Sequence, residues 1–216
     1  MIDVKQLLEE IKASPFEEIE VTAPHTGVVR FAVKEPGVKV VGPSGAHMEK
    51  PGTVVATLER ERNLKSVYAG IKGDLARVHA DLDGSFVEAG TPLCLIRHFL
   101  TKSEAIDSIL KKVLHLFYAP ERAKYFFVPD VDKKIKALGV RNVKVRDGME
   151  LFIASRMKRE RPLAYAGPEG QIYTVYFQYE QNVDAGQPLI GVCPESQVGL
   201  IEDVVGKVQS EWEERD

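Results

Sequence analysis

The sequence predicts a mainly β fold made of two similar halves, which short helices precede, join and follow. Three observations support this prediction. Short β-branched runs bounded by glycine or proline recur through two long stretches of the chain. Helical periodicity appears only at the two ends of the chain and between these stretches. Two sequence blocks of the first stretch recur in the second at a nearly constant offset.

The elements are expected in the following order. Residues 1–18 form an N-terminal helix, because apolar residues recur at helical spacing from Val4 to Ile11 before Pro15. Residues 19–99 form the first β domain. Residues 100–124 form a linking helix from Thr101 to Tyr118, with an apolar stripe along one face. Residues 125–199 form the second β domain, and residues 200–216 form an amphipathic helical tail.

Composition narrows the class of protein. The 216 residues include 29 basic and 32 acidic side chains, a net charge of −3, so neither nucleic acid nor an anionic membrane is an expected partner. No run approaches the roughly 20 apolar residues of a membrane span, and the N-terminus lacks a secretory pattern. Two cysteines are too few for a disulfide framework, and we therefore expect a cytoplasmic protein.

The internal repeat is carried by two blocks. AGIKGDL at residues 69–75 is similar to AGPEGQI at 166–172, an offset of 97 residues. VEAGTPL at 87–93 is similar to VDAGQPL at 183–189, an offset of 96 residues. The first copy therefore has one extra residue between its blocks, which we place near Asp83-Gly84. The glycines are those that punctuate consecutive hairpins.

These blocks resemble the second half of biotin- and lipoyl-attachment domains. In the first copy, APHTGVV at 23–29 resembles the family's opening strand, and EKPGTVVATLE at 49–59 resembles the approach to its modified hairpin. Residues 34–48 are similar to the thumb insertion of bacterial biotin carboxyl carrier proteins. The second copy lacks an Ala-Pro-x-x-Gly start between residues 125 and 194. The resemblance implies two tandem flattened β-barrels, each made of two small sheets with pseudo-twofold symmetry.

In that family, a lysine at the tip of a tight hairpin forms an amide with biotin or lipoate. It precedes the last glycine of the Ala-x-x-x-Gly block by eleven residues. This spacing leads to Arg62 in the first copy and Arg159 in the second. Arginine stays protonated and is a poor acyl acceptor. The expectation is therefore that both positions are degenerate and that no cofactor is attached.

Two lysines leave an alternative open. Lys158 lies one position before the expected second tip, so a one-residue shift of the hairpin would bring it to the site. Lys65 lies three positions after the expected first tip. If either lysine is modified, the cofactor would be biotin or lipoate.

Charged residues gather at both expected tips, with Arg60 and Glu61 in the first copy and Arg156 and Arg161 in the second. Arginine forks suit carboxylates and phosphates, so these residues are candidate contacts for a partner subunit or an acidic ligand. A solvated loop that remained after loss of the lysine is the simpler alternative. The five histidines lack metal-ligand spacing, and no nucleotide-binding or nucleophile motif is present. We therefore predict neither a metal site nor an enzyme.

Three functions agree with these observations. The favoured one is an unmodified accessory or scaffolding subunit of a biotin-dependent carboxylase or related acyl-transferring complex, whose partners are the other protein subunits. The second is a true biotin or lipoyl carrier modified at Lys158 or Lys65. The third is a stand-alone binding module for an acidic ligand at the arginine-rich tips. Paired modules are also compatible with a homodimer.

Overall fold

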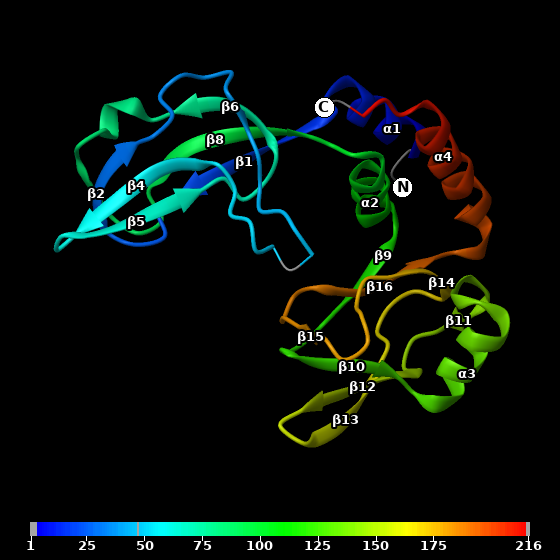
Figure 1. The fold of residues 1–216 in the computed structure, drawn as a ribbon. Helices are drawn as coiled ribbons and strands as arrows, with labels where there is room; N and C mark the ends of the chain where they lie inside the picture. The colour runs from blue at the N-terminus through cyan, green and yellow to red at the C-terminus, as the bar shows by residue number, and fades with distance from the viewer. Residues whose placement is uncertain (1–3, 47, 215–216) are drawn as a thin grey trace. The chain divides into compact units, whose positions relative to one another are not determined.

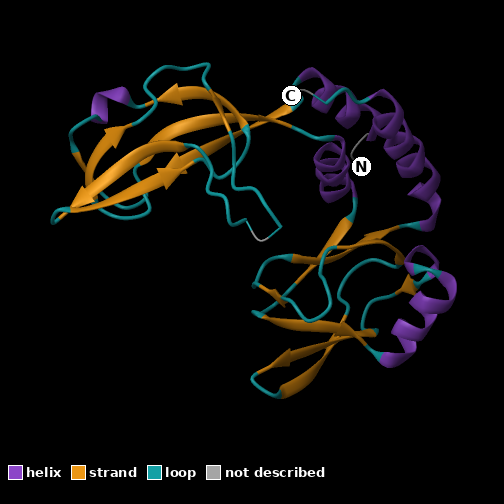
Figure 2. Ribbon diagram, in the orientation of Figure 1, coloured by secondary structure: helices purple, strands orange, loops and turns teal. Residues whose placement is uncertain are grey.

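A computed structural model describes residues 4–46 and 48–214 and is mainly β (Figures 1 and 2). Its internal contacts divide the chain into two compact units. Among the described residues, the first-copy unit comprises 13–46 and 48–101 with Glu214, and the second-copy unit comprises 4–12 and 102–213. Each unit contains one of the two predicted β repeats.

The first-copy unit contains two antiparallel four-stranded sheets, with strand orders β1-β8-β6-β3 and β5-β4-β2-β7. Side chains from both sheets share one core, in which Val29, Leu58, Leu75 and Ile96 are completely or almost completely buried. The strands are β1 (Phe16–Thr22), β2 (Gly27–Phe31), β3 (Lys39–Val40), β4 (Val54–Arg60), β5 (Asn63–Tyr68), β6 (Gly73–Val78), β7 (Phe86–Val87) and β8 (Pro92–Phe99).

The second-copy unit repeats this topology, with sheets ordered β9-β16-β14-β11 and β13-β12-β10-β15. Its core is richer in aromatic side chains, and Tyr125, Phe152 and Tyr165 are its largest buried residues. The strands are β9 (His115–Tyr118), β10 (Ala123–Phe127), β11 (Lys144–Val145), β12 (Glu150–Arg156), β13 (Arg159–Ala164), β14 (Gly170–Val175), β15 (Asn182–Val183) and β16 (Pro188–Cys193).

Strand order shows two levels of symmetry. Adding eight to each strand number converts the sheets of the first copy into those of the second. Within a copy, exchanging β1–β4 for β5–β8 in order converts one sheet into the other, so each copy has a twofold topology. The predicted internal duplication is therefore confirmed at the level of strand order.

Four α-helices occur in the described residues: α1 (Val4–Ala13), α2 (Lys102–Val113), α3 (Pro129–Leu138) and α4 (Val198–Glu211). The predicted N-terminal, linking and C-terminal helices are thus confirmed, with changed bounds. On the second copy, Leu110 from α2 and Ile201 from α4 pack against Tyr173 and Cys193 of its sheet. None of the described helices has the length and apolar character needed to cross a membrane.

Two predictions about helices were wrong. The linking helix ends at Val113, and residues 115–118 instead form β9, because this strand pairs with β16 and stacks Phe117 on Phe152 with ring centroids 5.9 Å apart. Helix α3 interrupts the second β stretch between β10 and β11. Its sequence signals were available, since Pro129 begins it, acidic residues occupy its first turn and Gly139 follows its end.

The opening motif of the second copy also lies earlier than expected, at residues 119–123, where Ala123 replaces the glycine. Ala23 and Ala119 are equivalent because they make the same backbone hydrogen bonds. The N–H of Ala23 donates to Thr91 O at 2.9 Å, and that of Ala119 donates to Gln187 O at 2.8 Å. The motif that seemed absent is therefore present with one substitution, and it positions Glu121 beside the second hairpin.

Candidate functional site: two hairpin tips and an arginine pocket

The first candidate tip is the turn between β4 and β5. Arg60 pairs with Asn63, which leaves Glu61 and Arg62 as a two-residue loop. Both loop residues have positive φ, 52° and 65°. Two consecutive left-handed residues are characteristic of the type I′ turn, whose twist matches that of the flanking strands. The structure therefore places Arg62 at the tip that the spacing predicts.

The second tip, between β12 and β13, has the same geometry with different residues. Arg156 pairs with Arg159, and the two loop residues are Met157 and Lys158, with φ of 50° and 62°. Lys158 follows Arg62 by 96 residues, the offset that also separates β12 from β4. Lys158 is therefore the structural equivalent of Arg62.

Arg159, the residue reached by counting back from Gly170, is not in the turn but begins β13. The eleven-residue spacing places the second tip one residue too late because the connection between β13 and β14 spans residues 165–169, whereas that between β5 and β6 spans only 69–72. One additional residue in this loop moves the tip by one position. The later connection, at 79–85 in the first copy and 176–181 in the second, restores the overall offset, in agreement with the extra residue predicted near Asp83-Gly84.

The two lysines that were alternative modification sites, Lys158 and Lys65, lie at different places in their hairpins. Lys158 is exposed at the tip, and within the described part of the chain its ammonium has no hydrogen-bond or ion-pair partner. Met157 beside it is 85% exposed. Lys65 instead lies within β5, opposite the buried Leu58, away from the turn. Of the two, the structure brings only Lys158 to a hairpin tip.

The charged neighbours of the tips are held by different partners. In the first copy, the Arg60 guanidinium donates to Thr26 Oγ1 at 3.1 Å and lies 3.9 Å from the Glu61 carboxylate. In the second copy, Arg156 Nη1 donates to Glu121 Oε2 at 2.9 Å. Both contacts are at least partly exposed, so their expected contribution to stability is small.

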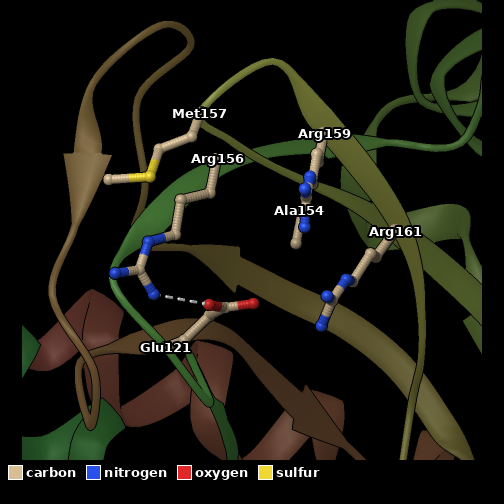
Figure 3. Close-up of a pocket in the computed structure, with 6 residues that line it drawn as sticks. All are labelled: Glu121, Ala154, Arg156, Met157, Arg159 and Arg161. Atoms are coloured by element: carbon tan, nitrogen blue, oxygen red, sulfur yellow. Dashed lines mark hydrogen bonds and ion pairs between the residues drawn. The ribbon is translucent and has the colours of Figure 1, made fainter.

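Three arginines of the second hairpin line one pocket of about 390 Å³ (Figure 3). Strand register explains their common side. Arg156 pairs directly with Arg159, Ala154 pairs with Arg161, and directly paired residues point to the same face of a sheet. Met157 and Glu121 complete the lining. From the sequence, Arg156 and Arg161 were candidate contacts for a partner or an acidic ligand, whereas Arg159 was the expected modification position. Glu121 was not indicated.

No family model matches this sequence, and no curated protein matches it. Among residues 4–46 and 48–214, no group of three or more His, Cys, Asp or Glu side chains is arranged to hold a metal ion. The features of this chain that bear on function are the hairpin geometry and the contrast between the two copies.

Proposed function

We propose that this protein is a tandem biotinyl/lipoyl-type protein whose second copy is a carrier modified at Lys158 with biotin or lipoate. The observation that carries the proposal is the position of Lys158 as second residue of an exposed type I′ turn. The duplicated two-sheet topology agrees with tandem flattened barrels, and the twofold strand order agrees with the symmetry that the family resemblance implies. This proposal favours the carrier over the unmodified scaffold that spacing alone suggested.

The chemistry of attachment fits the residues at this tip. A primary amine attacks an activated acyl carbon, the N–C bond forms, the acyl group's leaving group departs and the amine loses a proton. Lys158 can supply this amine because its side chain is exposed and within the described chain has no partner. The two-residue turn holds the lysine at the far end of the hairpin, and its four-carbon stem remains mobile. An attached biotin or lipoate would add the carrier chemistry of a swinging arm.

The first copy is proposed to act as an unmodified docking domain. Arg62 occupies the position of Lys158 and cannot be acylated in the same way. The row of residues next to this tip also carries two exposed apolar side chains: Phe86 and Leu64, 66% and 60% exposed, lie at its two ends, with Val28 and Glu59 between them. Exposed large apolar residues on one sheet face are a feature of protein contacts.

The equivalent row of the second copy is polar throughout. It consists of Glu160, Ser155, Lys124 and Asn182. The two copies therefore differ both at the tip and on the adjacent sheet face. This division supports docking by the first copy to another subunit of a biotin-dependent carboxylase or related acyl-transferring complex, and carriage by the second.

One observation favours an unmodified scaffold as the second candidate function. The family's biotin site reads Glu-Ala-Met-Lys-Met, whereas this tip reads Ser155-Arg156-Met157-Lys158-Arg159. The methionine before the lysine is retained, but two arginines replace the small and apolar residues around this pair. A modifying ligase would therefore meet a more basic hairpin, which disfavours attachment.

The deciding experiment is intact mass spectrometry of the protein from its native source, with peptide mapping of residues 156–161. The carrier proposal predicts an increment equal to one biotin or lipoate on Lys158. Lys158→Arg should abolish it, whereas Lys65→Arg, the matched control in the other hairpin, should not. An unmodified wild-type mass would contradict the carrier and support the scaffold.

A gain-of-modification variant tests whether the tip dipeptide is sufficient. Replacing Glu61 and Arg62 with Met and Lys transfers the second tip to the first copy, where the turn has the same two positive φ angles. We expect a second increment of the same mass in cells that modify Lys158. Absence of a second increment would show that residues outside the turn also determine recognition.

A further inference from the structure

We propose that the arginine pocket beside the second tip binds a small dianion, either a phosphate group or a compact dicarboxylate. The pocket is formed by Arg156, Arg159 and Arg161 together with the carboxylate of Glu121 (Figure 3). The site lies on the hairpin of the proposed carrier but requires no modification of Lys158. The acidic ligand expected from the sequence would thus bind at this pocket in the second copy, and it would be a small dianion.

Charge balance defines the ligand class. Three guanidinium groups line the pocket against one carboxylate, which leaves two positive charges uncompensated. Only Arg156 forms an ion pair there, with Glu121 at 2.9 Å, and within the described chain Arg159 and Arg161 have no hydrogen-bond or ion-pair partner. A dianion would neutralise this excess. Guanidinium forks are suited to phosphate and carboxylate because two parallel N–H groups meet two oxygens.

The hairpin holds these charges together at an energetic cost. Arg156 and Arg159 are direct cross-strand partners, and like charges in such positions repel each other. The short two-residue turn prevents the strands from separating them. Arg161 lies two residues further along β13 on the same face. A bound dianion would relieve this repulsion, since the arginines could then share its oxygens.

Glu121 shows that the pocket accommodates a carboxylate. In Figure 3 its side chain extends between Arg156 and Arg161, with one oxygen bonded to Arg156. Its backbone is restrained, because the Glu121 carbonyl accepts a hydrogen bond from the buried Tyr125 hydroxyl at 2.6 Å. The carboxylate is therefore an internal competitor for any external anion, and its removal should strengthen binding.

The first copy provides a matched comparison within the same chain. At positions equivalent to Arg156, Arg159 and Arg161 it has Arg60, Asn63 and Lys65, so two of the three guanidinium groups are missing. Arg60 is in addition hydrogen-bonded to Thr26. Binding should therefore depend on the second hairpin and be insensitive to substitution in the first.

The test is isothermal titration of the full-length Lys158→Arg protein with inorganic phosphate and, separately, with malonate, at constant ionic strength. This background excludes any effect of modification. We expect saturable binding, weakened roughly tenfold by Arg159→Gln or Arg161→Gln, as for loss of a charge-assisted hydrogen bond. Glu121→Gln should tighten binding several-fold. Lys65→Gln, in the first hairpin, should leave it unchanged.

The outcomes separate the sources of the anion. Binding of phosphate alone assigns the pocket to a phosphate-bearing ligand, binding of malonate alone assigns it to a dicarboxylate, and either result supports the proposal. Absence of saturable binding to both, or equal binding by the Lys158→Arg protein and by the same protein with Arg159→Gln and Arg161→Gln, would overturn it. Neither failure affects the mass test of Lys158, so the two proposals can fail separately.

Discussion

Gly170 at the start of β14 has no room for even the smallest side chain unless the neighbouring backbone shifts. A Cβ added there would lie 2.5 Å from the carbonyl oxygen of Cys193 and 2.9 Å from its carbon. Both atoms belong to the backbone of β16, the strand that pairs with β14. Strand β14 would thus have to shift by roughly half an ångström or more in a close-packed sheet. Gly170→Ala should therefore destabilise the second-copy unit.

The magnitude follows from two opposing effects. Overpacking of this kind costs about 1–3 kcal/mol. Replacement of glycine by alanine also restricts the unfolded chain, which stabilises the protein by about 0.4–1 kcal/mol wherever the native backbone is compatible. We therefore expect Gly170→Ala to lower the free energy of unfolding by about 1–2 kcal/mol.

Gly206 in α4 is the matched control in the same unit. An added Cβ meets no atom within 4 Å there, and Gly206 lies in a helix interior. Gly206→Ala should stabilise by about 0.5–1 kcal/mol. The unfolded-state contribution is common to both variants, so their difference isolates the clash at Gly170.

Urea unfolding of both variants can be followed by the fluorescence of Trp212. It is the chain's one tryptophan and is 8% exposed in the second-copy unit. Equal stability of Gly170→Ala and Gly206→Ala would refute the predicted clash, because it would mean that the backbone of β16 moves away from the added Cβ with no loss of stability.

Two further predictions concern other parts of the fold. Leu58→Ala should lower the free energy of unfolding by about 2–5 kcal/mol because Leu58 is fully buried. Leu64→Ala on the partner strand should change it by less than about 0.5 kcal/mol, because Leu64 is exposed. Equal shifts of the two urea midpoints, measured by circular dichroism, would contradict this. The pKa of Asp132 is lowered from its ordinary value of 3.8, first by the hydrogen bond from Lys136 and then by that from the Tyr179 hydroxyl. A carboxyl with a lowered native pKa stabilises the fold above its unfolded pKa and loses this effect as pH falls through the native value. The stability difference between wild type and Asp132→Asn should therefore be present at pH 7 and shrink below pH 3.8, and an equal difference at pH 7 and pH 3 would refute the assignment.

Much of the architecture could be predicted from local sequence because the relevant signals are local. Alternating β-branched runs and turn glycines predicted two β-rich copies, and helical periodicity predicted α1, α2 and α4. The capping and charge signals of α3 were equally local and could have been recognised from Pro129 and Gly139. Strand β9 could not have been recognised from local sequence, because its apolar residues also continue the apolar stripe of the preceding helix. Pairing with β16 decides its conformation.

The sequence by itself determined the duplication, the mainly β class and the position of Arg62, because each depends on residue order within one continuous segment. Only the tertiary structure decided that Lys158, and not Arg159, occupies the second tip. Loop length between β13 and β14 is variable, so counting across it is uncertain by one residue. The pairing of Arg156 with Arg159 removes this uncertainty. The same pairing brings three arginines to one face of the hairpin, where Glu121, from a separate segment, completes the pocket.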